Sequence, residues 1–220
     1  MSEKNIKQIY DEYAAEMAKL YFHKSTIHDL YANELKRLKN QNYENSEKML
    51  FKDFRDGDLK IFGMVETNCE EQQELIFILK NRQYQWLVAE AFEHFDDFIE
   101  NAYAYIGYID NSCWPMRDYG NIKLNELSNK KFDWFLTQSQ SKKTKDILNE
   151  FRTLFSELKS IEAHRKKSEL PPKFVLNFIA QLRHRIVHNG GKVNDKSKFI
   201  KEIFDDSGIQ NKGQYDDFIN

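Results

Sequence analysis

The spacing of apolar residues predicts a long helix that begins near the N-terminus and ends at about Lys39. Its apolar positions follow alternating steps of four and three, with two charged interruptions, which is a heptad-like seam. Ser2 or Asn5 is placed to cap the helix start, and residues 40–42 (Asn-Gln-Asn) end it. Two interpretations stay open: one long helix packed along the body, or a helical arm that forms dimers. The seam residues are Ile6, Tyr10, Tyr13, Met17, Leu20, Ile27, Tyr31 and Leu38.

The stretch that follows the first helix is harder to assign. A short helix is predicted near residues 44–55, where Met49, Leu50 and Phe54 form its apolar side. The Asp-Gly-Asp sequence at 56–58 is a turn signal. Residues 59–65 are the one strand-like run that the pattern offers. We expect an extended segment or loop there, because a lone strand has no partner in sight.

A second long helix is predicted to start at a capping box and to continue to Ile109. Asn68 stands three residues before Glu71, and a wide apolar stripe follows. A break near Asn81 stays open. Four acids lie on the other side of this helix, and they form either a solvated face or a partner for a downstream arginine, Arg183. These acids are Glu93, Asp96, Asp97 and Glu100.

Residues 110–140 are predicted to contain a loop followed by a short helix within 124–135. Four aromatic residues there have two interpretations: they stack on nucleic-acid bases, or they pin the loop to the core. These aromatic residues are Trp114, Tyr119, Trp134 and Phe135.

Two helices are predicted after this loop. The first runs from Ser141 to about Lys167, with an apolar stripe at helical spacing. The second runs from Pro172 to His188, because proline is tolerated in the first helical turn and the Asn-Gly-Gly sequence at 189–191 suits a left-handed C-cap. The tail beyond is polar except for a short helix or strand at 199–204.

Composition supports a helical fold. The 220 residues include 17 Phe and 11 Tyr but only eight Gly and three Pro, which favours long helices over sheet. Neither cysteine belongs to a CxxC pair, so no disulfide framework or zinc site is implied. We expect a soluble, cytoplasmic protein, because the chain shows no signal peptide and no run of the ~18 apolar residues that a membrane span needs.

The last turns of the helix that begins at Pro172 carry the candidate chemistry. Arg183, His184, Arg185 and His188 fall within six residues. His184 and His188 share a face, whereas Arg183 and His188 lie about 140° apart around the axis. The negative end of the helix dipole favours the protonated form of His188, and arginine offers a fork of donors to phosphate oxygens. These groups suffice for metal-free RNA cleavage, in which the ribose 2′-hydroxyl is the nucleophile.

This stretch resembles the R-x4-6-H motif of the HEPN superfamily (higher eukaryotes and prokaryotes nucleotide-binding domains). Arg183, four intervening residues and then His188 fit the motif, although His184 stands where the family prefers a polar residue such as Asn. The resemblance implies an all-α helical bundle, which we expect at residues 69–205. The N-terminal helical extension (1–68) lies outside the resemblance, and a polar tail (206–220) follows the bundle. It also implies a homodimer in which two motif helices form one composite site, so that Arg183 and His188 converge from two chains.

By this resemblance the chain is a metal-independent endoribonuclease without a cofactor, acting as a toxin or effector in bacterial stress or antiviral defence. His188 is the acid and base, Arg183 stabilises the phosphorane, and His184 orients or carries a second proton. Arg185, Asn189 and Lys192 contact RNA, although Asn189 has a simple capping role as its alternative. An antitoxin or regulatory protein is a further expected partner. No Tyr closely follows His188, so regulation by modification of such a Tyr is not supported.

Charge and three alternatives bear on this hypothesis. The net charge is −2, yet residues 173–201 hold seven Lys or Arg and one acid, which fits either a phosphate-bearing partner or a polar surface.

The motif residues also have simpler interpretations. The two arginines form a solvated face, and the histidines form a metal pair or a helix cap. A non-catalytic HEPN module that binds RNA, nucleotide or a protein partner is the main alternative function. A helical scaffold that assembles through the N-terminal arm is the third.

Overall fold

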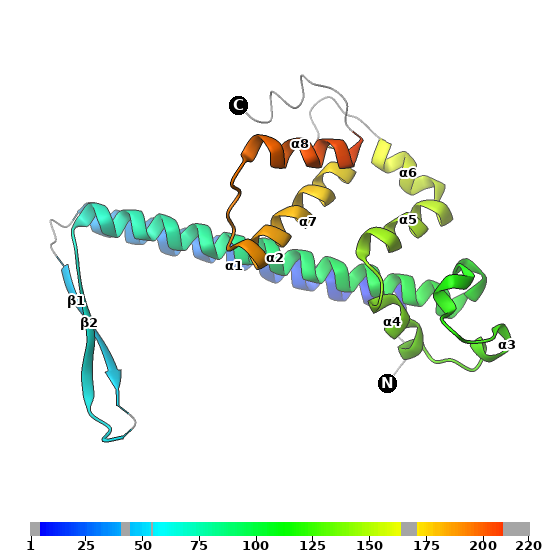
Figure 1. Cartoon of the computed structure of the whole chain (residues 1–220), viewed down its shortest axis with the longest axis horizontal. Coiled ribbons are helices and arrows are strands. Elements are labelled where there is room, and N and C mark those ends of the chain that lie inside the picture. Colours follow the sequence, from blue (N-terminus) through cyan, green and yellow to red (C-terminus); the bar gives the residue numbers. More distant parts are fainter. Residues whose placement is uncertain (1–4, 41–44, 54, 164–170, 209–220) are drawn as a thin grey trace. The chain divides into compact units, whose positions relative to one another are not determined.

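The computed structural model describes residues 5–40, 45–53, 55–163 and 171–208. The prediction of an all-α helical bundle with long amphipathic helices is confirmed, with one β-hairpin added (Figure 1). The chain divides into two compact units, Met1–Leu20 with Val88–Asn220 and Tyr21–Leu87. The domain limits expected at residues 68 and 205 stay a prediction, and much of the expected polar tail, from 209, lies outside the described residues. The helices are α1 (Ile6–Lys39), α2 (Cys69–Ile109), α3 (Leu124–Leu127), α4 (Phe132–Gln140), α5 (Thr144–Leu154), α6 (Ser156–Ala163), α7 (Pro172–Asn189) and α8 (Lys196–Ser207).

Both long helices begin as their sequences predict. Asn5 and Gln8 cap each other at the start of α1, with both N–H···O distances at 2.9 Å. Asn68 and Glu71 form the same reciprocal box before α2, again at 2.9 Å. These caps satisfy amide groups that have no partner inside a helix. Helix α2 is unbroken, so the open question of a break near Asn81 is settled.

The helix predicted near 44–55 is wrong, because this segment is a strand. Strand β1 (Asn45–Lys52) pairs antiparallel with β2 (Leu59–Thr67). The run at 59–65 therefore has a partner, namely the segment whose short apolar cluster suggested a helix. The periodicity of so short an apolar run fits a helix and a strand equally well. Pairing with β2 determines that residues 45–52 form a strand. The register shifts between Met49 and Leu50, so the ladder contains a bulge or irregularity.

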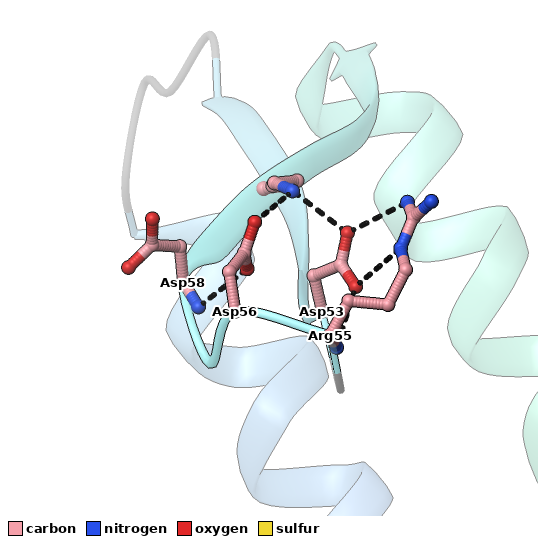
Figure 2. A network of polar contacts seen from close by, with 5 residues as sticks. Asp53, Arg55, Asp56 and Asp58 are labelled. Atoms are coloured by element: carbon pink, nitrogen blue, oxygen red, sulfur yellow. Dashed lines mark hydrogen bonds and ion pairs between the residues drawn. The ribbon is translucent and has the colours of Figure 1, made fainter.

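Charged side chains fasten the turn of this hairpin (Figure 2). The Asp53 carboxylate accepts hydrogen bonds from Arg55 and, at 2.7 Å, from Lys60 Nζ, which also lies 2.6 Å from Asp56 Oδ2. The Asp53 side chain is almost enclosed. These hydrogen bonds from Arg55 and Lys60 lower the pKa of Asp53 to about 2. Gly57, with φ of 78°, supplies the left-handed residue that the turn needs.

The larger unit has a core in which the second half of α2 is surrounded by α3, α4, α5 and the loop after α2. Trp114 stacks on Tyr103 of α2 with ring centroids 4.7 Å apart, and its Nε1 donates to the Tyr103 carbonyl at 2.9 Å. Trp114, Tyr119 and Phe135 are all buried, and Trp134 packs edge-on against Phe135. Of the two interpretations of these aromatics, the structure supports the one in which they pin the loop to the core.

A buried polar cluster ties this loop to the core as well. Asp118 is 4% exposed, accepts a hydrogen bond from the Tyr103 hydroxyl and forms an ion pair with Lys142. Burial, followed by the hydrogen bond with Asp118, raises the pKa of Tyr103. A buried carboxylate needs such partners, because an unpaired charge in the interior is costly. The cluster therefore joins α2, the loop after α2 and the turn between α4 and α5.

Two predicted helices are shorter than the apolar pattern indicated. The expected helix at 124–135 is two helices, α3 and α4. The helix expected from Ser141 to about Lys167 is broken at Phe155, whose extended backbone (φ −120°, ψ 102°) separates α5 from α6. The expected end of that helix at 164–167 lies outside the described residues. Arg152 and Glu162 join α5 to α6 across the break through two hydrogen bonds of 2.8 Å.

Helices α7 and α8 pack on each other around an aromatic cluster. Phe174 is fully buried and meets Phe204 edge-on with centroids 4.9 Å apart, and Ile203 is 1% exposed beside them. The expectation of a helix or strand at 199–204 is resolved as a helix that begins at the Asp195 cap. This pair of helices positions the residues around Arg183 and His188.

Candidate functional site

The local structure of α7 follows from its ends. Pro172 opens the helix, where a missing N–H costs nothing. Gly190 ends it in the left-handed conformation (φ 60°, ψ 30°), and its N–H donates to the Arg185 carbonyl. The predicted helix is thus confirmed within one residue at its C-terminal end. The polar residues at 183–188 occupy its last turns.

Arg183 is held by an acid of α2. Its Nε lies 2.9 Å from Glu93 Oε1, and its Nη2 donates to the same oxygen. Of the two interpretations of the acids on α2, the ion pair with Arg183 is confirmed for Glu93. The two side chains are 31% and 53% exposed, and a partly exposed pair contributes only about 0.2–1 kcal/mol to stability. The pair therefore orients the guanidinium more than it stabilises the fold.

Two further acids next to this pair are partly buried. Burial raises the pKa of Asp96, against a hydrogen bond that the Thr144 hydroxyl donates at 2.5 Å. Burial also raises the pKa of Glu100, and the neighbouring acids Asp97, Asp96 and Glu93 raise it further. Thr144 opens α5, so Asp96 fastens that helix to α2. Arg183 therefore lies beside several carboxylates, and Glu93 is the one that contacts it directly.

The two histidines of α7 face solvent together. The rings of His184 and His188 lie 4.7 Å apart between centroids at an angle of 49°, and both residues are exposed. This is the arrangement expected for positions four apart on one helix. Among the described residues, no contact joins Arg183 to His188. The single chain thus brings the histidines together and leaves the arginine on another side of the helix.

Arg185 lies against α8. Its guanidinium carbon is 5.9 Å from the centre of the Phe199 ring. With the Asn189 amide in the orientation that satisfies both of its polar atoms, Asn189 Oδ1 accepts from Arg185 Nη1 at 3.0 Å and Nδ2 donates to the His188 carbonyl at 3.1 Å. Arg185 Nε is buried without a hydrogen-bond partner in the described part of the chain. Phosphate contact by Arg185 stays a prediction, and these contacts limit its reach.

The remaining predicted residues lie near the helix end. Lys192 is exposed just beyond α7, and its backbone N–H donates to the Asn189 carbonyl at 3.3 Å. Its RNA contact, like that of Asn189, stays a prediction. Sequence reasoning missed the support that Phe199 gives to Arg185, because that contact depends on how α8 folds back. The apolar spacing at 199–204 was the available signal.

A pocket of about 330 Å³ lies beside the first half of α7, N-terminal to the two histidines. Phe92 and Phe95 of α2 line it together with Ala180 of α7. Charged residues of both signs complete the lining; they are Lys145, Arg152, Lys173, Glu162 and Asp206. Arg152 and Glu162 form an ion pair with each other.

Two searches of the described residues bear on the type of site. No group of three or more His, Cys, Asp or Glu side chains is arranged to hold a metal ion within these residues. Within the same residues, no helix contains an apolar stretch long enough to cross a bilayer. Comparison of the chain with protein-family models, with curated proteins and with solved structures gives no match.

Proposed function

We propose that the chain is a metal-independent endoribonuclease of the HEPN type, with its chemistry in the last turns of α7. The observation that carries this proposal is the exposed pair His184 and His188 on the same short stretch as Arg183, which Glu93 holds in place. Imidazole moves protons near neutral pH, and guanidinium binds phosphate oxygens. Cleavage of RNA by attack of the ribose 2′-hydroxyl requires proton transfer and stabilisation of the charge on the phosphorane, and these two side-chain types supply both.

The reaction divides between these groups as follows. The 2′-oxygen attacks the adjacent phosphorus, and His188 accepts its proton. Arg183 stabilises the negative charge of the phosphorane, and the 5′-oxygen leaves with a proton from His184 or from the protonated His188. The products are a 2′,3′-cyclic phosphate and a 5′-hydroxyl. This reaction consumes no oxidant and no nucleotide, and none of its steps uses a metal ion.

A second copy of the chain completes the proposed site. Arg183 and His188 are five residues apart, so one helix directs them about 140° from each other. Arg183 contacts Glu93, whereas His188 is exposed. Two motif helices that meet in a homodimer bring Arg183 of one copy toward His188 of the other. The proposed partners are thus RNA and a second chain, with an antitoxin or regulator as a further partner; a toxin or effector role follows only from the resemblance.

Cleavage of a broad set of RNAs in the presence of EDTA tests this proposal. The unaltered chain is compared with Arg183→Ala and His188→Ala. His23→Ala is the matched control, because His23 is an exposed histidine of α1, outside the motif helix. We expect cleavage by the unaltered chain and the control, with cyclic phosphate ends, and at least a hundredfold loss in both motif variants. Equal cleavage by His188→Ala overturns the assignment. RNA binding without products moves it to the non-catalytic module.

A further inference from the structure

We propose that the Tyr21–Leu87 unit is an assembly surface, on which the first half of α2 pairs antiparallel with the same segment of a second copy. This surface is separate from the proposed catalytic residues of α7, and the inference does not depend on the ribonuclease activity. It rests on an apolar stripe of α2, on the area that this stripe exposes, and on the order of charges along the helix.

The stripe consists of four large side chains that recur at helical spacing. Leu75, Ile78, Leu79 and Trp86 lie within about 100° around the α2 axis, yet they are 47%, 43%, 46% and 70% exposed. The face of α2 that packs inside the unit is a different one. It holds Ile76, which is buried, and Tyr84, whose hydroxyl lies 3.5 Å from His28 Nδ1 of α1. The centre of the stripe is about 140° from that face.

The stripe exposes a contiguous apolar area that a helix pair can bury. Its four side chains together expose on the order of 400 Å², which is in the size range of the functional apolar patches of monomers. Two such stripes bury about 800 Å² in total, at the low end of the size range for specific interfaces. The unit's other exposed large apolar side chains lie outside the stripe; they are Tyr21, Phe22, Leu30, Leu59, Ile61 and Phe77.

The order of charges favours a second copy in antiparallel orientation. Arg82 lies within the stripe and Glu74 at its edge, and neither has an ion pair in the part of the chain that the structure describes. We place a twofold axis between Ile78 and Leu79, so that Ile78 of one copy lies opposite Leu79 of the other. The same axis brings Arg82 of each copy within one helical turn of Glu74 of the other. A parallel pair instead sets like charges side by side, which is unfavourable.

Light scattering of the full chain, which gives the molar mass of the assembly, tests this inference. We compare Leu79→Glu with Ser160→Glu, which adds the same charge at an exposed position of α6, in the other unit. We expect Leu79→Glu to halve the mass of the assembly and Ser160→Glu to leave it unchanged, with equal helix content by circular dichroism. A wild-type chain that stays monomeric, or a Leu79→Glu chain with the wild-type mass, overturns the inference.

A charge exchange tests the orientation. Arg82→Glu sets like charges together at both ends of the pairing, so we expect it to lower the mass, and the double variant Glu74→Arg, Arg82→Glu to restore it. A double variant that stays dissociated overturns the antiparallel register. Variants of this stripe change the assembly mass without touching Arg183 or His188. A Leu79→Glu chain with the wild-type mass therefore overturns this inference alone, whereas a monomeric wild-type chain also overturns the dimer of the proposed ribonuclease.

Discussion

Arg183 of α7 is anchored on Glu93 of α2, with the guanidinium Nε 2.9 Å from Oε1. The two residues are 90 positions apart in the chain, and each belongs to a helix whose limits the sequence predicts. Their contact fixes where the guanidinium points, and it leaves the other donors of the arginine for a phosphate.

The first prediction concerns this contact. Glu93→Ala frees the Arg183 side chain, so we expect RNA cleavage to fall about tenfold, which corresponds to ~1.4 kcal/mol of transition-state stabilisation. Stability should change by less than about 1 kcal/mol, because the pair is partly exposed. The measurement is kcat/KM together with urea unfolding. Glu90→Ala, an exposed acid one turn earlier on α2, is the control; equal activity of Glu93→Ala and Glu90→Ala contradicts a positioning role.

The second prediction concerns the buried polar cluster of Asp118. Asp118→Ala leaves the Tyr103 hydroxyl and the Lys142 ammonium without their partner, so we expect a loss of about 3–5 kcal/mol in the free energy of unfolding. Asp205→Ala removes an exposed acid of α8 and should be nearly neutral. Chemical denaturation of both variants measures the difference, and similar midpoints for the two contradict the prediction.

The third prediction compares two glycines. Gly190 has a left-handed backbone but nothing within 4 Å of an added Cβ, so Gly190→Ala should cost only the backbone strain, about 1–2 kcal/mol. A Cβ at Gly107 overlaps the Trp114 indole, which is buried. Gly107→Ala should therefore destabilise the chain more than Gly190→Ala does. Thermal unfolding ranks the two variants, and a lower stability of Gly190→Ala than of Gly107→Ala disproves the close approach of Trp114 to Gly107.

The fourth prediction concerns the support of α7 by α8. Ile203 is 1% exposed among the phenylalanines that join the two helices. Ile203→Ala removes three buried carbons and should cost about 2–4 kcal/mol. Ile161→Ala, at a 61% exposed position, is the matched control and should be within about 0.5 kcal/mol of the wild type. Unfolding midpoints that coincide for the two variants disprove the assigned core.

The fifth prediction concerns pH. The pKa of Asp53 is lowered from 3.8 to about 2, so its ionised form stabilises the hairpin above pH 3.8, and this contribution is lost as the pH falls through about 2. NMR titration of the Asp53 carboxyl should give a midpoint well below that of an ordinary aspartate. Asp53→Asn should reduce the acid dependence of the hairpin amides and leave the part that the Asp56–Lys60 ion pair contributes. Asp58→Asn alters a side chain without a hydrogen bond or ion pair in the described residues and should preserve that dependence. An Asp53 midpoint at its ordinary value rules out the described contacts.

Features set by neighbouring residues could be predicted from the sequence. The capping boxes of Asn5 and Asn68 involve partners three positions away, and the end of α7 follows from Gly190. These signals act within one turn, so the chain reveals them without tertiary information. The helical fold and most helix limits follow from such signals together with the apolar spacing.

Features set by distant residues could not be predicted in the same way. Strand β1 was misassigned because its apolar cluster is short, and only pairing with β2 decides its conformation. The break at Phe155 lies within a continuous apolar stripe that does not mark it. At the candidate site, the sequence offered four acids as partners of Arg183, and only the placement of α7 against α2 selects Glu93.

A metal-free site shared by two chains can be tested by mixing two inactive variants. Arg183→Ala and His188→Ala are denatured together, refolded in equal amounts and assayed for RNA cleavage in EDTA. Half of the dimers are then mixed, and each mixed dimer keeps one of its two sites, with Arg183 from one chain and His188 from the other, so we expect about a quarter of the wild-type activity. A mixture that forms mixed dimers and stays as inactive as each variant alone contradicts the shared site.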